Sequence, residues 1–293
     1  HPGLVESVEL FPGPYPVQYG GFAGGIVLAR SAKPAPEPHG EAALRATDSS
    51  ALLDLPLNDS TDLTLAGRYS YANPILHLFA RDLDVAYWDY HARLVRRWTQ
   101  RPPTPLHVFS AHDLLTDRNE GDRRVVYGVD FHRVTLRLEK VGQGRALSVE
   151  SFGGWDRSQV RGGDVTVRDV STGLRLDALQ QLAHGVALRG GASAKADRYR
   201  LDVSRLDDSS ARADYLEQYP ARVDGVVGGY VALELLLGPR VVMRPGLRVD
   251  VYRSPGVSAV GVDPRFSAEY RVTPRLTLFS GFGIAHQPPS SAV

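Results

Sequence analysis

The chain contains no cysteine and very little lysine. The absence of cysteine excludes a disulfide framework, a thiolate nucleophile and a cysteine-ligated metal centre. Because lysine occurs only at positions 33, 140 and 195, nearly all of the positive charge is carried by arginine. The planar guanidinium group pairs with carboxylates in a fixed geometry, so this composition favours networks of ion pairs over a solvated basic face. A coding bias towards arginine would give the same composition.

Charge of one sign is not in excess either, since 34 basic residues are balanced by 33 acidic ones. The chain as a whole has no electrostatic attraction for nucleic acid, and we expect no nucleic-acid partner. No apolar run of about 18 residues is present, which excludes a membrane-spanning helix. This criterion does not exclude the strands of a membrane barrel, because their apolar and polar residues alternate.

What the chain does have is alternation with a period of two, which predicts strands with one apolar and one polar face. Leu247, Val249 and Val251, for example, alternate with Arg248 and Asp250. The same pattern is present at residues 62–71, 86–94 and 265–272. Between residues 40 and 287, where there is little helical periodicity, it predicts roughly twelve or thirteen strands.

The connections between these strands are of two kinds. Short ones are predicted at residues 57–60, 99–104, 141–144, 238–240 and 272–274, and longer polar ones near 73–84, 116–123, 156–163, 204–224 and 253–260. Residues 174–186 fit either a short helix or a strand end with a loose turn, and we assign them to a connection on the short side. Short turns at one end and long loops at the other are typical of outer-membrane barrels. The sequence therefore predicts an all-β fold, part of an antiparallel up-and-down transmembrane β-barrel.

The first 31 residues are predicted to form a separate unit. Proline fixes φ and glycine permits positive φ, so residues 12–14 and 20–21 predict two tight turns. The neighbouring residues 5–10 and 25–29 are rich in β-branched and aliphatic side chains and predict strands. Three prolines within residues 32–38 exclude a strand ladder or a helix interior there and predict a linker.

These N-terminal residues resemble the end of the plug domain in TonB-dependent outer-membrane receptors. In that family a strand ending in Glu and an apolar pair is followed by Gly-Pro, a Tyr-Gly step and Gly-Gly. The matching residues, which the resemblance implies are structural parts of the gate, are Glu9, Gly13, Tyr19, Gly20, Gly24 and Gly25. Pro12 and Leu28 depart from the pattern, since many members carry Arg and Asn or Asp there. Residues 67–71, 87–92 and 273–278 also look like barrel segments of this family.

The resemblance implies that residues 1–31 end a plug domain, residues 32–38 form a linker, and residues 39–293 form a partial barrel. It implies an internal fragment of a receptor in the outer membrane of a Gram-negative bacterium. Such a fragment should not function alone, because an incomplete barrel has two unpaired edges.

The function that the resemblance implies is energised uptake of a scarce solute such as a ferric siderophore, cobalamin or an oligosaccharide. The implied partners are outer-membrane lipid, that solute and the TonB energy-coupling complex, which would contact a segment preceding residue 1. This protein would make or break no bond, so we expect neither an enzyme activity with catalytic residues nor a cofactor.

Four polar residues are predicted to face the barrel interior, namely Arg68, Asp89, His91 and Arg93. The last three alternate along one strand, so acid, imidazole and guanidinium groups lie within reach of one another. Such a cluster resembles a catalytic one, but in a barrel it hydrates the interior and holds the plug by charge pairing. His107 and His112 differ in parity and face opposite sides of a strand, so no metal site is expected.

The long connection at residues 204–224 is the best candidate for ligand capture, because loops on a rigid scaffold carry binding residues. Its candidate contacts are Arg205, Arg212, Tyr215 and Tyr219. The tryptophans fit interfacial girdles better than a platform for a sugar or aromatic ligand. Residues 58–60 match a glycosylation acceptor, but turn chemistry also favours Asn, Asp and Ser there.

Two other functions are consistent with these observations. A passive or structural outer-membrane barrel would use the first 30 residues as an ordinary hairpin. A soluble β-sandwich that binds carbohydrate would also alternate. Hydrolase, nucleotide-binding and zinc-protease functions are disfavoured, because the Gly-x-Ser-x-Gly, phosphate-loop and His-Glu-x-x-His motifs are absent.

Overall fold

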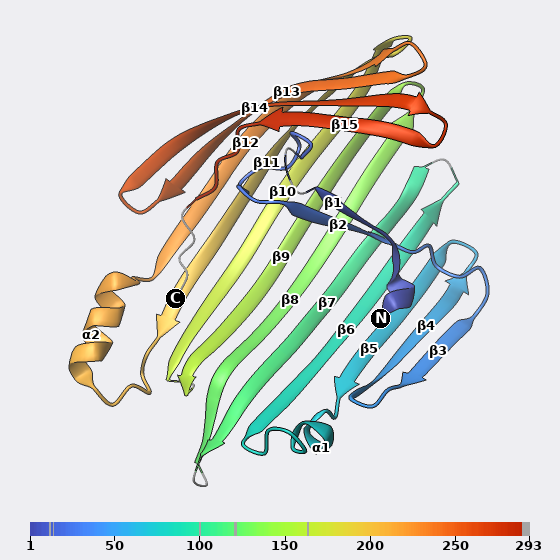
Figure 1. The fold of residues 1–293 in the computed structure, drawn as a ribbon. Coiled ribbons are helices and arrows are strands. Elements are labelled where there is room, and N and C mark those ends of the chain that lie inside the picture. The colour runs from blue at the N-terminus through green and yellow to red at the C-terminus, as the bar shows by residue number, and fades with distance from the viewer. Residues whose placement is uncertain (12, 14, 100, 120–121, 163, 289–293) are drawn as a thin grey trace.

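The computed structural model describes residues 1–11, 13, 15–99, 101–119, 122–162 and 164–288. It contains a two-stranded sheet, β1–β2, and a thirteen-stranded sheet whose order β3 to β15 follows the sequence. All neighbouring strands are antiparallel, so the large sheet has the predicted up-and-down topology. Within the described residues it does not close, and β3 and β15 form its edges (Figure 1).

The small sheet consists of β1 (Val5–Phe11) and β2 (Ile26–Ser31), preceded by a 3-10 turn at Pro2–Leu4. The strands of the large sheet are β3 (His39–Leu44), β4 (Asp48–Asn58), β5 (Thr61–Ser70), β6 (Leu83–Trp98), β7 (Arg101–Asn119), β8 (Asp122–Gly142), β9 (Arg145–Gly162), β10 (Val165–Ala183), β11 (Val186–Asp202), β12 (Arg222–Leu237), β13 (Val241–Ser254), β14 (Val257–Thr273) and β15 (Leu276–Gly283). Two helices, α1 (Asn73–Leu76) and α2 (Ser209–Gln218), lie in connections. Neither helix in this part of the chain is long and apolar enough to cross a membrane.

The large sheet has a polar face and an apolar face, as the alternation predicts. On the polar face Arg248 and Asp250 are 2% and 1% exposed, whereas Leu247 and Val251 on the apolar face are 42% and 45% exposed. The small sheet lies across the polar face (Figure 1). It is held there by hydrogen bonds from arginines of the large sheet. Arg248 and Asp250 are therefore buried between two layers, and the apolar residues point outward.

The two ends of the large sheet differ in their connections. At one end, called the turn end, β4–β5, β6–β7, β8–β9, β10–β11, β12–β13 and β14–β15 are joined by two or three residues. At the other, called the loop end, two long connections contain α1 and α2 (Figure 1). The long connections near 73–84 and 204–224 are confirmed. The short connections are confirmed in place, but the strands run further than predicted, most of all at residues 101–104, which belong to β7.

Three predicted long connections are wrong. The segments 116–123, 156–163 and 253–260 are mostly strand, and their described residues pair with neighbouring strands. Residues 120–121 and 163 lie outside the described residues. Segments 116–123 and 156–163 look like loops in the sequence because they are polar at nearly every position. Segment 253–260 looks like one because of Pro255 and Gly256, which form only a two-residue turn. Backbone hydrogen bonding does not depend on side-chain polarity, so the ladder continues.

Residues 174–186 are also corrected. β10 runs through Leu174 to Ala183 and pairs with β11 over almost its whole length, so only residues 184–185 form the turn. Gly185 has a φ of +75°, a conformation that glycine adopts without strain. In the sequence, the apolar residues of this strand fit either a strand or a short helix, and the two-residue turn gives little signal of its own, which explains the error.

Candidate functional site

The connection between β1 and β2 packs against the polar face of the large sheet. Across the sheet, Glu9 of β1 forms an ion pair with Arg30 of β2 at 3.0 Å. Gly13 and Gly24 lie in the connection between the two strands, and a Cβ added to either would meet no atom within 4 Å. Pro12 and Pro14 lie outside the described residues. Gly13 and Gly24 therefore matter for the backbone conformation of the connection and not for close contacts with the large sheet.

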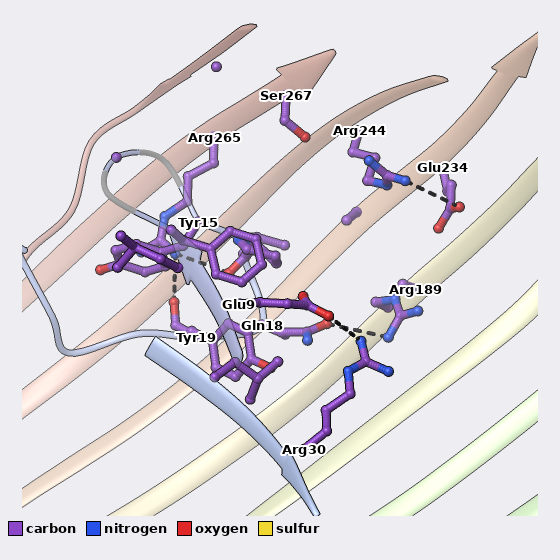
Figure 2. Close-up of a pocket in the computed structure, with 18 of the residues that line it drawn as sticks. Glu9, Tyr15, Gln18, Tyr19, Arg30, Arg189, Glu234, Arg244, Arg265 and Ser267 are labelled. Atoms are coloured by element: carbon purple, nitrogen blue, oxygen red, sulfur yellow. Dashed lines mark hydrogen bonds and ion pairs between the residues drawn. The ribbon is translucent and has the colours of Figure 1, made fainter. Parts of the chain in front are cut away.

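Two arginines of the large sheet hold residues 16–19 by their main chain. Arg248 of β13 donates to the carbonyl oxygen of Gln18 at 3.2 Å. Arg265 of β14 donates to the carbonyl oxygens of Pro16 at 3.3 Å and Tyr19 at 2.6 Å. Figure 2 shows Arg265 directed at this segment between Tyr15 and the neighbouring strands.

Each of these arginines is paired with an aspartate two residues away on its own strand. Arg248 contacts both carboxylate oxygens of Asp250 at 2.7 Å, and Arg265 contacts Asp263 at 2.8 Å. The four side chains are between 1% and 4% exposed. Residues i and i+2 of a strand share a face, and Arg248 lies opposite Asp263, so opposite charges alternate over two strands. We call Arg248, Asp250, Asp263 and Arg265 the carbonyl clamp.

The pairing explains how buried guanidinium groups can bind neutral carbonyl oxygens. An unpaired charge is costly to bury, and attraction to each aspartate offsets part of that cost. A guanidinium group has five N–H donors, so donors remain after the carboxylate is bound. Arg248 uses one more on Ser193 at 2.7 Å. The clamp is thus a neutral unit that presents directed N–H groups to the segment.

Aromatic rings complete the contact between the segment and the large sheet. The Arg265 guanidinium lies 4.2 Å from the centre of the Tyr15 ring, and the Arg175 guanidinium lies 5.2 Å from that of Tyr19. Burial raises the pKa of Tyr15, an effect that Arg265 offsets in part. The Tyr15 hydroxyl therefore stays protonated and donates to the carbonyl oxygen of Phe22.

Gly20 is the point of closest approach between the segment and the clamp. A Cβ at this position would lie 1.9 Å from Arg248 Nε and 2.6 Å from an oxygen of Asp250. Gly228 on the large sheet has the same property, since its Cβ would lie 1.7 Å from Asp250 Oδ1. Glycine is required at both positions because the paired side chains occupy the space that a Cβ would need.

A cavity of about 1310 Å³ lies between the small sheet and the polar face on the side of the turn end. Charged and amide side chains from both sheets line it (Figure 2). Arg189 donates to the Gln18 side chain at 3.3 Å, and Arg244 lies 3.9 Å from Glu234. Apolar side chains such as Val17 and Phe279 share the lining, so the cavity has both polar and apolar walls.

The four residues predicted for the polar face lie on it, and one of them, Arg93, contacts the N-terminal part of the chain. Arg68 and Asp89 form an ion pair at 2.6 Å between β5 and β6. Arg93 donates to Thr64 at 3.0 Å and to the carbonyl oxygen of Ala32, the first residue of the predicted linker. The His91 ring lies 5.5 Å from that of His107. Their predicted role in holding a plug stays a prediction.

His112 lies on the face of the sheet that its position in the alternation predicts. His112 stacks on Trp88 of the apolar face and contacts Asp130, on the side opposite His107. No group of three metal-ligating side chains is present among the described residues. In the turn that begins at Asn58, the Asn58 side chain accepts from the backbone N–H and the hydroxyl of Ser60, both at 3.0 Å, which is the predicted turn chemistry.

The predicted ligand-capture connection contains a helix that the sequence did not reveal. Arg212 lies on α2 and donates to the carbonyl oxygen of Leu206, while Arg205 is exposed before the helix. Tyr215 is on α2 and Tyr219 is its C-terminal cap. The four candidates are thus carried on one short helical unit. Asp208 caps it, accepting from the backbone N–H groups of Ser210 at 2.8 Å and Ala211 at 3.3 Å.

Replacing Asp208 with alanine is expected to loosen the first turn of α2. The hydroxyl of Ser210 and the two backbone N–H groups lower the pKa of Asp208, so the cap stabilises the helix above the ordinary pKa of an aspartate and is lost as pH falls through the lowered value. Hydrogen exchange of the Ser210 and Ala211 amides should become faster in the variant at neutral pH. The matched variant Asp207→Ala should leave both amides protected, and equal exchange in the two variants would contradict the cap.

Comparison with known proteins gives similarity of structure only. No protein-family model and no curated protein matches the sequence. The fold is similar to that of the siderophore receptor PirA from Acinetobacter baumannii, with a TM-score of 0.70 and 18% identity over 98% of this chain and 48% of that one. It is also similar to the pyoverdine outer membrane receptor FpvA from Pseudomonas aeruginosa, with a TM-score of 0.73 and 14% identity over 95% and 51%. The iron transporter FrpB from Neisseria meningitidis gives 0.68 and 14% over 98% and 53%.

The chain therefore spans about half the length of these solved structures and has the fold of that half. The open sheet of the described residues and the small sheet on its polar face agree with such a partial match. At these identities the comparison concerns the fold, and function must be argued from the residues.

Proposed function

We propose that this chain is part of a TonB-dependent receptor in the outer membrane of a Gram-negative bacterium. In this proposal residues 1–31 end the plug, residues 32–38 link it to the wall, and residues 39–293 belong to the barrel. The observation that carries the proposal is the carbonyl clamp, which holds a separate hairpin against a polar wall beside a cavity. A gate needs such an arrangement, because it must be seated firmly and still be removable.

The contacts of the hairpin suit removal by force. Among them are hydrogen bonds from Arg248 and Arg265 to carbonyl oxygens, and water can replace each of these bonds at a small net cost. The Arg248–Asp250 and Arg265–Asp263 pairs lie wholly within the wall, so they persist when the hairpin leaves. A pull on a segment preceding residue 1 would therefore break weak contacts in sequence and leave no unpaired charge behind.

We propose a ferric siderophore as the substrate class, because the similar solved structures are described as siderophore, pyoverdine and iron receptors or transporters. Arg205, Tyr215 and Tyr219 at the loop end would supply a cation and aromatic faces for an anionic, aromatic chelate. Arg212 would serve by fixing the helix, since its guanidinium is used on Leu206. The protein itself would carry out no covalent chemistry.

Locking the hairpin to the wall should stop uptake. A Cβ at Gly246 would lie 3.2 Å from the Cβ of Val17, close to the separation in a disulfide, and the sequence given contains no cysteine. In the full-length receptor, Val17→Cys/Gly246→Cys is expected to lose nearly all energy-dependent uptake of a radiolabelled ferric siderophore when oxidised. A thiol reductant should restore uptake. The single variant Val17→Cys is the control and should transport under both conditions.

The same experiment separates the proposal from a passive or structural barrel. Uptake that is unchanged by the disulfide, or that persists without the energy-coupling complex, would contradict an energised gate. Binding of the siderophore at the loop end should survive the lock, because the disulfide lies at the hairpin and not in residues 203–221.

A further inference from the structure

The chain that leaves β2 is bonded to the large sheet by a buried arginine. Arg93 of β6 donates to the carbonyl oxygen of Ala32, the first residue after β2. Its other terminal nitrogen donates to the Thr64 hydroxyl of β5 at 3.0 Å, and that hydroxyl donates to Asp54 of β4. The three residues of the large sheet lie directly opposite one another on adjacent strands. We call Asp54, Thr64 and Arg93 the linker anchor.

The linker anchor is buried and directed. Arg93 is 4% exposed, Thr64 1% and Asp54 8%. An isolated guanidinium group would be costly to bury there, and the nearby carboxylate, which reaches it through the Thr64 hydroxyl, offsets part of that cost. Because Thr64 holds one terminal nitrogen in place, the planar guanidinium group presents the other to Ala32 in a fixed direction. The contact with Ala32 is therefore more than a chance encounter with a solvated side chain.

Ala32 is bonded to the start of the hairpin as well. Its N–H donates to the carbonyl oxygen of Leu4 at 2.9 Å, one position before the Val5–Ser31 pair that begins the β1–β2 ladder. Residues 4 and 32 thus form the open end of the hairpin. Among the residues that the structure describes, 33–38 form no hydrogen bond or ion pair, so the wall holds the chain at Ala32 and next at β3.

The hairpin is therefore attached at both of its ends, to separate parts of the large sheet. The linker anchor on β4–β6 holds the open end at Ala32. The carbonyl clamp on β13–β14 holds residues 16–19 in the connection between β1 and β2. Figure 1 shows the small sheet stretched across the polar face between these two regions. A force on the segment preceding residue 1 reaches the hairpin at the open end, where Ala32 is fixed.

We propose that Arg93 is a positioning residue of the gate, which keeps β2 on the wall while a pull strips β1 away from it. This inference rests on the energised gate proposed above. Leu4 is drawn away from a neighbour that cannot follow, and the hydrogen bonds of an antiparallel ladder run perpendicular to its strands. They therefore break one pair after another, starting at Val5 and Ser31. β2 stays at the linker anchor, and β1 pairs with it again when the pull ends.

Force spectroscopy on the full-length receptor in a lipid bilayer tests the proposal. The force is applied through a handle on the segment preceding residue 1. The last two force peaks are expected to come from release of residues 16–19 by the carbonyl clamp and then of Ala32 by the linker anchor. Their spacing in contour length should be about 45 Å, because residues 20–32 extend by about 3.5 Å each.

Arg93→Ala is expected to lose the last of these peaks and to keep the peak of the carbonyl clamp. Arg68→Ala is the matched control, because it removes another polar-face arginine of the neighbouring strand, one that pairs with Asp89 at 2.6 Å. It should keep both peaks at the same spacing. Two unchanged peaks in Arg93→Ala would overturn the proposal.

Insertions locate the fixed point with an unmodified wall, so the test does not depend on the folding of Arg93→Ala. Five Gly and Ser residues inserted after Gly24 should widen the spacing by about 17 Å. The same insertion after Pro36 should leave the spacing unchanged, because it lies beyond Ala32. Equal widening by the two insertions would place the fixed point at β3 and overturn the proposal.

Energised uptake of a ferric siderophore, measured separately in the unmodified receptor, distinguishes the two proposals. Absent uptake together with both peaks at the expected spacing would contradict the receptor function and leave the linker anchor in place. Normal uptake without the last peak would overturn the linker anchor and leave the receptor function in place.

Discussion

Replacing Arg248 with alanine is expected to destabilise the full-length protein by about 3–5 kcal/mol, because Asp250 is left as a buried charge without its partner. The carboxylate is 1% exposed, and the removed side chain provides both of its 2.7 Å contacts. The Gln18 carbonyl oxygen loses its donor in the same step. Equilibrium unfolding in urea, followed by tryptophan fluorescence, measures the loss, and hydrogen exchange of residues 15–20 reports release of the segment.

A thermodynamic cycle separates the pair from its surroundings. Arg248→Ala/Asp250→Ala should be more stable than Arg248→Ala, because the unpaired charge is gone, yet its residues 15–20 should still exchange faster than in the parent. Arg137→Ala is the control, since that arginine also lies on the polar face but is 49% exposed and has carboxylates only at 3.8 and 3.9 Å. Its loss should stay below about 1 kcal/mol. Equal losses for Arg137→Ala and Arg248→Ala would contradict the clamp.

Gly20→Ala should unseat the segment from the opposite side of the same contact. The new Cβ would lie 1.9 Å from Arg248 Nε, so either the arginine leaves Asp250 or residues 15–20 move away from the wall. Overpacking of this kind costs about 1–3 kcal/mol. Faster hydrogen exchange of residues 15–20 and greater sensitivity to limited proteolysis there are the expected measurements.

Glycines of the same turn region provide matched controls for Gly20. Gly13→Ala and Gly24→Ala place a Cβ where no atom lies within 4 Å, so they should change stability by less than about 0.5 kcal/mol. In the Arg248→Ala background, Gly20→Ala should cost little, because the clashing side chain is absent. If Gly24→Ala and Gly20→Ala behave alike, the effect comes from backbone flexibility and not from the clamp.

The strands of the sheet could be predicted because the difference in polarity between the two faces of the sheet determines the residue pattern of most strands. Alternation at Leu247 to Val251 identifies both the strand and its two faces, and every such segment proved to be a strand with the predicted polarity. The prediction failed where that signal is absent. Residues 156–162 are polar on both faces, and the strand there is maintained by the backbone ladder and by cross-strand ion pairs such as Arg133–Asp156.

The site was less predictable for a different reason. The alternation predicts that Arg248, Asp250 and Arg265 lie on the polar face. The spacing of two residues in Arg248–Asp250 and in Asp263–Arg265 also suggests paired charges. Nothing in the sequence, however, indicates that Arg248 meets Gln18, which is 230 positions away. That contact depends on the register between strands and on where the hairpin docks. The helix α2 was missed because its apolar residues do not form a helical stripe.

The hydrogen bonds from the clamp to the segment go to carbonyl oxygens of residues 16, 18 and 19, and every residue has a carbonyl oxygen. Substitutions among these three residues therefore leave the clamp contacts intact, whereas a change at Gly20 does not. A hairpin from a distant chain should accordingly keep these hydrogen bonds on this wall wherever its main-chain path and the close-approach glycine are kept. Only the side-chain contacts, such as those of Tyr15 with Arg265 and of Gln18 with Arg189, would then need compensating changes when hairpin and wall are exchanged.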